Sequence, residues 1–184
     1  MMTSMDLVFR PATAGDAAAL AVFGERAFRD AFGPHNTAAD MAAYCGAAFA
    51  VDRVGRELGD PDRHTVLAYL RGELVGYAQL RAAPPPAFIT GDAPIELLRF
   101  YVDGRWHGRG IAQALMAAVL EAAAVRGAHS LYLAVWEHNH RAAAFYAKHG
   151  FAKVGRVPFV LGSDRQIDDV MARPLAAAAA RAAE

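Results

Sequence analysis

The feature that most constrains this sequence is a strand pattern that runs through glycines into a helix pattern. Residues 99–116 read RFYVDGRWHGRGIAQALM, with aromatic and β-branched residues first, then Gly104, Gly108 and Gly110, then an Ala, Leu and Ile pattern. Amides at a helix N-terminus point outward without partners, and the helix dipole adds partial positive charge there. Glycines beside such a terminus let a phosphate approach the main chain. The segment HGRGIA therefore predicts a phosphate-binding loop, although its glycines alone would also suit a tight turn.

Two common phosphate motifs do not fit this segment. A P-loop needs Gly-Lys-Ser/Thr, whereas Gly110 is followed by Ile-Ala. A dinucleotide fingerprint needs a third glycine or alanine where Gln113 stands, and an acidic residue at the end of the next strand. Arg105 and Arg109 place positive charge beside the loop, so an anion is still the expected ligand.

The surrounding sequence alternates strand and helix patterns. Strands are expected at residues 7–13 (broken by Pro11), 64–70, 74–80, 95–102, 130–136, 151–161 and 168–175. Helices are expected at 16–32, from 37 or 38 to 49 and on through 51–58, at 110–126 and at 140–149. The clearest hairpin joins 64–70 to 74–80, and a proline-rich loop at 81–94 should line a site. This order predicts an α/β architecture with a mixed sheet.

Length and composition favour one domain, over residues 1–175, followed by an alanine-rich tail at 176–184. Nineteen basic residues balance nineteen acidic ones, so neither nucleic acid nor a membrane surface is the expected partner. The single cysteine, Cys45, excludes an internal disulfide and is expected to be a buried free thiol. No signal peptide or spanning apolar run is seen, which favours a cytoplasmic protein. The oligomeric state stays open, with a homodimer as one option.

A second motif follows the strand at 130–136, in LAVWEHNHRAAAFYAKHGF. Asn139 is placed to cap the next helix, and Tyr146 lies two helical turns further on the same face. Taken alone, these residues would suit a cap and core packing. A metal site made of Glu137, His138 and His140 is not expected, because neighbouring strand-end positions on opposite faces seldom converge on one ion.

Together the two segments resemble the GNAT superfamily of acetyl-CoA-dependent N-acetyltransferases. The family's loop pattern of Gln or Arg, two residues, Gly, one residue and Gly or Ala is matched from His107 through Gly110 to Ala112. Its second pattern is matched by Asn139, Ala142, Phe145, Tyr146, Gly150 and Phe151. Two positions depart from the family, with His107 in place of Gln or Arg and Gly104 where many relatives have proline.

The resemblance implies a sheet of about six to seven mostly antiparallel strands, splayed at the cofactor site and flanked by about four helices. It implies that acetyl-CoA is the co-substrate and that the amine attacks its thioester directly. Cofactor binding is implied for Phe100, Tyr101, Val102, His107, Gly108, Arg109, Gly110, Ile111, Ala112, Asn139 and Tyr146. Tyr146 is the candidate general acid, since a phenol is protonated at neutral pH. Glu96 is the first candidate base, through water, and Glu137 the second.

The acceptor is the least determined part of the prediction. The segments FRDAFGPHNTAADMAAYCGAAF, IELLRFYV and VPFVLGSDRQIDDVM resemble the bacterial spermidine/spermine N-acetyltransferase branch. Asp30, Asp40, Glu96 and Asp164 are acids that would suit a polyamine, or equally a solvated surface. The alternatives are another small amine, a protein N-terminus, or a non-catalytic acyl-CoA-binding module.

Overall fold

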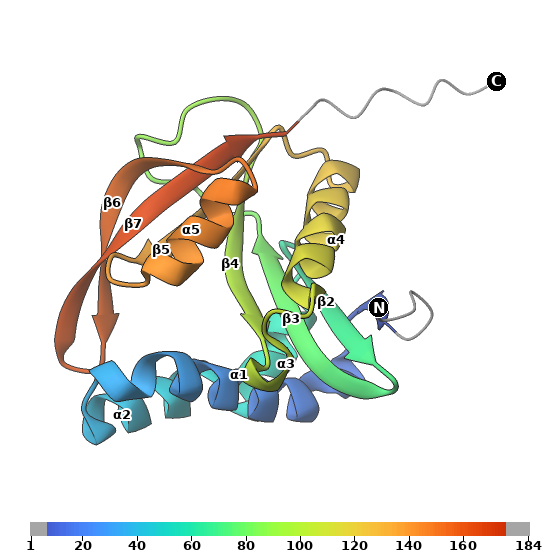
Figure 1. Cartoon of the computed structure of the whole chain (residues 1–184), viewed down its shortest axis with the longest axis vertical. Coiled ribbons are helices and arrows are strands. Elements are labelled where there is room, and N and C mark those ends of the chain that lie inside the picture. The colour runs from blue at the N-terminus through green and yellow to red at the C-terminus, as the bar shows by residue number, and fades with distance from the viewer. Residues whose placement is uncertain (1–6, 176–184) are drawn as a thin grey trace.

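The computed structural model describes residues 7–175, which fold into one mixed sheet with helices on both faces (Figure 1). The sheet has the order β1-β2-β3-β4-β5-β7-β6 within the described residues. Its strands are β1 (Leu7–Pro11), β2 (Arg63–Leu70), β3 (Glu73–Arg81), β4 (Pro94–Val102), β5 (Ser130–Trp136), β6 (Ala152–Leu161) and β7 (Asp164–Pro174). The helices are α1 (Ala17–Phe32), α2 (Ala38–Ala48), α3 (Val51–Leu58), α4 (Ile111–Val125) and α5 (His140–Lys148). The predicted α/β class and mostly antiparallel sheet are confirmed.

The first third of the chain holds three helices, where about two were expected, so residues 7–175 contain five α-helices in place of about four. The reason is local. Ala50 takes an extended conformation, with ψ of 133°, and separates α2 from α3. The stretches expected at 38–49 and 51–58 agree closely with the bounds of these two helices.

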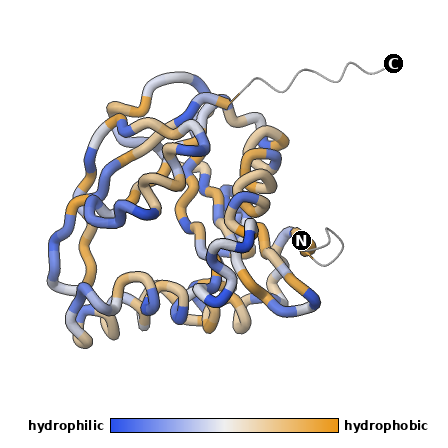
Figure 2. Tube along the Cα trace, in the orientation of Figure 1, coloured by the Kyte–Doolittle hydropathy of each residue, from blue (hydrophilic) through white to orange (hydrophobic). Residues whose placement is uncertain are grey.

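Side chains from the two faces of the sheet form separate cores. On one face, Ile95 and Leu97 of β4 pack in a cluster with Leu115 of α4 and Tyr146 of α5. On the other face, two clusters combine residues of α1, α2 and α3 with strand residues such as Tyr77 of β3. Figure 2 shows hydrophobic residues recurring along α4 and interspersed with hydrophilic ones along the strands, as a two-faced sheet requires.

The predicted hairpin of β2 and β3 is confirmed, with the two-residue turn Arg71-Gly72. Both turn residues have positive φ, 51° and 81°, which suits the twist of the two strands. Cys45 is fully buried, as expected. None of the helices within residues 7–175 is long and apolar enough to cross a membrane. The predicted tail at 176–184 lies outside the described residues.

The sheet opens between its two central strands. β4 pairs with β5 in parallel over three residues, Pro94 to Glu96, and the rest of β4 has no partner on that side. A register shift leaves Leu98 unpaired with β3 just where this divergence begins. In Figure 1, β4 and the β6–β7 pair then diverge toward α1 and α2. The splayed sheet expected from the family resemblance is therefore present.

Candidate active site

The loop between β4 and α4 has the geometry of an anion cradle. Gly108 and Gly110 have positive φ, 74° and 83°, and a Cβ built on either would meet no atom within 4 Å. The first helical bond of α4 runs from the Ala114 amide to the Gly110 carbonyl, so the amides of residues 111–113 have no helical acceptor. These free amides beside open space fit the pyrophosphate of a nucleotide-type cofactor.

Three side chains shape this loop. The Nε2 atom of His107 lies 2.9 Å from the Val102 carbonyl oxygen, so the histidine braces the end of β4. Arg105 is engaged by Asp103 and Glu73, at 2.8 and 2.6 Å, and its charge is largely balanced. The Arg109 guanidinium lies 5.1 Å from the Trp106 ring centroid and makes no ion pair with a described residue. Arg109 is therefore the loop cation left for an incoming anion.

The backbone of β4 presents polar groups to the gap. The Asp103 amide donates to the Val75 carbonyl on β3, at 2.9 Å. Because successive amides point to opposite sides of a strand, the amides of Val102 and Phe100 point away from β3, toward the gap. An extended ligand lying along β4 could take up these groups.

Helix α5 begins and ends as its sequence predicts. The Asn139 Oδ1 accepts a hydrogen bond from the Ala142 amide at 3.1 Å, which confirms the cap. Tyr146 is 9% exposed, and its ring lies 6.2 Å from that of Phe100 and 5.7 Å from that of Phe151. Its hydroxyl makes no hydrogen bond to any residue in the described part of the chain. Burial raises the pKa of Tyr146, so the phenol keeps its proton at neutral pH.

The two candidate bases lie apart from Tyr146. Glu96 projects to the face of β4 opposite Ile95 and Leu97, whereas Tyr146 packs on their face. The Arg81 Nε donates to Glu96 at 2.8 Å, and both residues line a cavity of about 320 Å³ under the proline-rich loop. Glu137 is ion-paired with Arg156 at 2.6 Å, at the end of β5. Glu96 and Tyr146 thus lie on opposite faces of the sheet, and Glu96 lies where β4 still pairs with β5.

A cluster of aromatic side chains on the face of α1 and α2 was not predicted from the sequence. Tyr44 stacks on Phe28, with ring centroids 4.6 Å apart, and meets the edge of Phe159 at 5.5 Å. Trp136, at the end of β5, meets Phe32 edge-on at 6.3 Å. Asp168 of β7 lies directly opposite Trp136. The members of the cluster come from α1, α2 and the last three strands, so no local motif could have indicated it.

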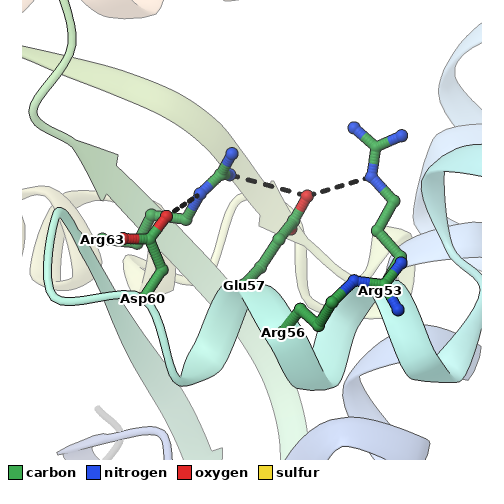
Figure 3. Close-up of a pocket in the computed structure, with 5 residues that line it drawn as sticks. All are labelled: Arg53, Arg56, Glu57, Asp60 and Arg63. Atoms are coloured by element: carbon green, nitrogen blue, oxygen red, sulfur yellow. Dashed lines mark hydrogen bonds and ion pairs between the residues drawn. The ribbon is translucent and has the colours of Figure 1, made fainter.

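A second cavity of about 320 Å³ lies beside α3, lined by Arg53, Arg56, Glu57, Asp60 and Arg63 (Figure 3). Glu57 pairs with Arg53 at 3.2 Å and with Arg63 at 3.5 Å, whereas Arg56 makes no ion pair with a residue among 7–175. Glu57 also pairs with Arg99 of β4 at 2.6 Å. These contacts hold α3 against the sheet. Within residues 7–175 no group of His, Cys, Asp or Glu side chains is placed to hold a metal ion.

Comparisons with known proteins agree with this geometry. Residues 26–151 match the Acetyltransferase (GNAT) family. The chain is 38% identical over 161 residues to an uncharacterized N-acetyltransferase of Mycobacterium tuberculosis, covering 87% of this chain and 98% of that protein. It is 28% identical over 92 residues to the spermine/spermidine N(1)-acetyltransferase of Bacillus subtilis, covering 50% of this chain and 60% of that protein.

Among solved structures, the fold resembles that of the PaiA N-acetyltransferase from Thermoplasma acidophilum in complex with coenzyme A. The TM-score is 0.75 at 16% sequence identity, covering 92% of this chain and 99% of that one. The predicted family is confirmed, whereas the likeness to a polyamine acetyltransferase covers only half of the chain. The chain belongs to the GNAT family and is an acetyl-CoA-dependent N-acetyltransferase.

Proposed function

We propose that this enzyme transfers the acetyl group of acetyl-CoA to a primary amine by direct attack in a ternary complex, with a polyamine-type cation as acceptor. The observation that carries the proposal is the gap between β4 and β5, which has the glycine cradle at one end and the buried Tyr146 hydroxyl beside it. Acetyl-CoA supplies the activated thioester. All other steps are assigned to residues of this chain.

Binding of the cofactor is assigned to backbone groups. Residues 107–112 would hold the pyrophosphate through the free amides at the start of α4, with Arg109 adding positive charge. The gap-facing backbone at residues 100–102 would pair with the pantetheine arm. Asn139 uses its Oδ1 as a cap, which leaves its Nδ2 free to donate to the same arm.

The Val102 backbone amide would donate a hydrogen bond to the thioester carbonyl oxygen and stabilise the charge that develops there. Proton transfer is assigned to side chains. The Tyr146 hydroxyl, protonated and without another hydrogen bond, would give its proton to the departing thiolate. Glu96 would take up the proton of the amine through water, from the opposite face of β4. Its pairing with Arg81 orients the carboxylate.

The choice of a cationic acceptor is supported by the aromatic cluster and Asp168 on the other face. Aromatic rings and a carboxylate favour a cation over a neutral amine. The partial likeness to a spermine/spermidine N(1)-acetyltransferase supports the same choice. Of the acids first considered, Asp40 is bound to the Ser163 amide at 2.6 Å and Asp164 accepts from Gln166 at 2.8 Å, so neither is free for a substrate.

Release of free CoA thiol from acetyl-CoA tests the proposal. The acceptor panel contains spermidine, spermine, an aminoglycoside, an amino acid and a peptide with a free N-terminus, with a reaction lacking acceptor as the control. We expect the polyamines to give the highest kcat/KM. A peptide as the best acceptor would contradict the polyamine assignment alone. Binding of acetyl-CoA without turnover of any amine would contradict the proposed reaction and favour a binding module.

A further inference from the structure

Asp168 of β7 is a buried acid without a partner. The residue is 9% exposed, and its Oδ1 is fully buried with no hydrogen bond. Neither carboxyl oxygen makes a hydrogen bond or ion pair with another residue among 7–175. Buried carboxyl groups in folded proteins are normally paired, because desolvating an unpaired charge is costly. A group left in this state requires an explanation.

The neighbours of Asp168 explain why it stays unpaired. Trp136 of β5 and Val157 of β6 lie directly opposite it in the two adjacent strands, so both side chains project to the same face. The acidic residues Asp169 and Glu137 both act on its carboxyl group with like charge. The nearby cations Lys153 and Arg156 are bound to Asp169 on the opposite face. Residues 7–175 thus supply no cation to Asp168.

Asp168 lies beside the part of β5 that borders the gap. Strand β5 pairs with β4 only as far as Tyr132, and Trp136, directly opposite Asp168, is the last residue of β5. Tyr146 packs in one cluster with Met171 of β7, and Asp168, three residues before Met171, projects to the other face of the sheet. Asp168 is therefore close to the gap but on the face opposite the proposed general acid.

We propose that Asp168 binds a second, non-reacting ammonium group of the acceptor, beside Trp136, which lies directly opposite it. This inference rests on the proposed amine acetylation and narrows its acceptor to amines that carry at least two basic nitrogens. One amino group reaches the thioester near Tyr146, while the other replaces the missing cation at Asp168. The ring of Trp136 favours an alkylammonium through its π face. Asp168 is thus a specificity-determining residue that touches substrate without taking part in proton transfer.

The test compares two acceptors that share a chain length and differ only in the distal charge, 1,6-diaminohexane and hexylamine. The wild-type enzyme, Asp168→Asn and Asp169→Asn are compared by steady-state kinetics with acetyl-CoA. Asp169→Asn is the matched control, because it removes the same charge one residue away on the opposite face of the sheet. Calorimetric titration with 1,6-diaminohexane gives a readout independent of turnover, and melting curves confirm folding.

We expect the wild type and Asp169→Asn to prefer the diamine in kcat/KM by at least about tenfold, the worth of a charge-assisted hydrogen bond. Asp168→Asn should lose this preference through KM, with its activity toward hexylamine unchanged. A preference retained by Asp168→Asn, or lost equally by Asp169→Asn, would overturn the inference. Binding of 1,6-diaminohexane that depends on Asp168, without CoA release, would support the site and contradict the proposed reaction instead.

Discussion

Replacing Asp168 by asparagine should make the folded protein more stable at neutral pH. Burial, together with the charges of Asp169 and Glu137, raises the pKa of the Asp168 carboxyl from 3.8 to about 6. At 1.36 kcal/mol per pKa unit, this difference corresponds to ~3 kcal/mol of destabilisation once the folded-state group is ionised. An asparagine amide in the same place is also buried, and its own desolvation offsets part of the gain. We therefore expect a net stabilisation of about 1–3 kcal/mol.

The pH dependence of the stability difference identifies the ionisation of Asp168 as its cause. Below the ordinary pKa of 3.8 the carboxyl is protonated in both the folded and the unfolded state, and its ionisation costs nothing. Between pH 3.8 and about 6 the unfolded state releases the proton first, so the free energy of unfolding falls as the pH rises. Above about pH 6 the folded-state carboxyl is ionised, and its full cost to the free energy of unfolding is present. The difference between Asp168→Asn and the wild type should therefore be small near pH 4, grow toward pH 6 and then remain constant.

Urea unfolding of the wild type, Asp168→Asn and Asp169→Asn at several pH values between 4 and 8 measures this difference. Each kcal/mol should also appear as a rise of roughly 2–4 °C in Tm. The opposite sign is expected for Asp169→Asn, because Lys153 and Arg156 lower the pKa of that carboxyl and would lose their partner. Our reasoning fails if Asp168→Asn is less stable than the wild type, or if its gain does not vary with pH. In either case the carboxylate would have a structural partner.

Three further perturbations test the rest of the site and fold. Tyr146→Phe keeps the ring, so it should lower kcat by about 10²-fold while the Kd for acetyl-CoA, measured by calorimetry, stays unchanged; full activity would assign the proton to another group. Gly110→Asp should weaken acetyl-CoA binding at least about tenfold, whereas Gly127→Asp, with similar positive φ and open space at the other end of α4, should not. Glu57→Gln should lower the free energy of unfolding by about 3 kcal/mol, because Arg99 would lose its 2.6 Å ion pair, and a neutral result in urea unfolding would show that water replaces it.

The cofactor side of the molecule could be predicted from the sequence because its parts are local. A cradle needs a strand end, small residues and a helix start in succession, and all three stand between residues 99 and 116. The Asn139 cap and the placement of Tyr146 on α5 depend on helical spacing alone, which the structure confirms. Because the backbone amides that bind phosphates in such a site belong to residues of any type, the sequence indicates the site only at the positions that must stay small.

The faces of β4 could not be predicted in the same way. Strict alternation would place Leu97 and Phe100 on opposite faces, yet both pack against the α4 and α5 side. The unpaired Leu98 rotates the strand by one residue and turns Arg99 toward Glu57. A bulge of this kind depends on how β3 and β4 register, which no single segment specifies. The stretches expected at 38–49 and 51–58 agree closely with α2 and α3, but they were counted as one helix, whereas the extended Ala50 divides them.

The acceptor side differs because it consists of side chains from distant segments. Tyr44 comes from α2, Trp136 from β5 and Asp168 from β7, so no local motif contains them. An unpaired buried carboxylate lowers the stability of the fold, and a substrate ammonium would supply the charge that it lacks. A site that binds a cation gains affinity from the same desolvation that lowers its stability. The free energy that Asp168 removes from folding would thus be recovered when the acceptor binds.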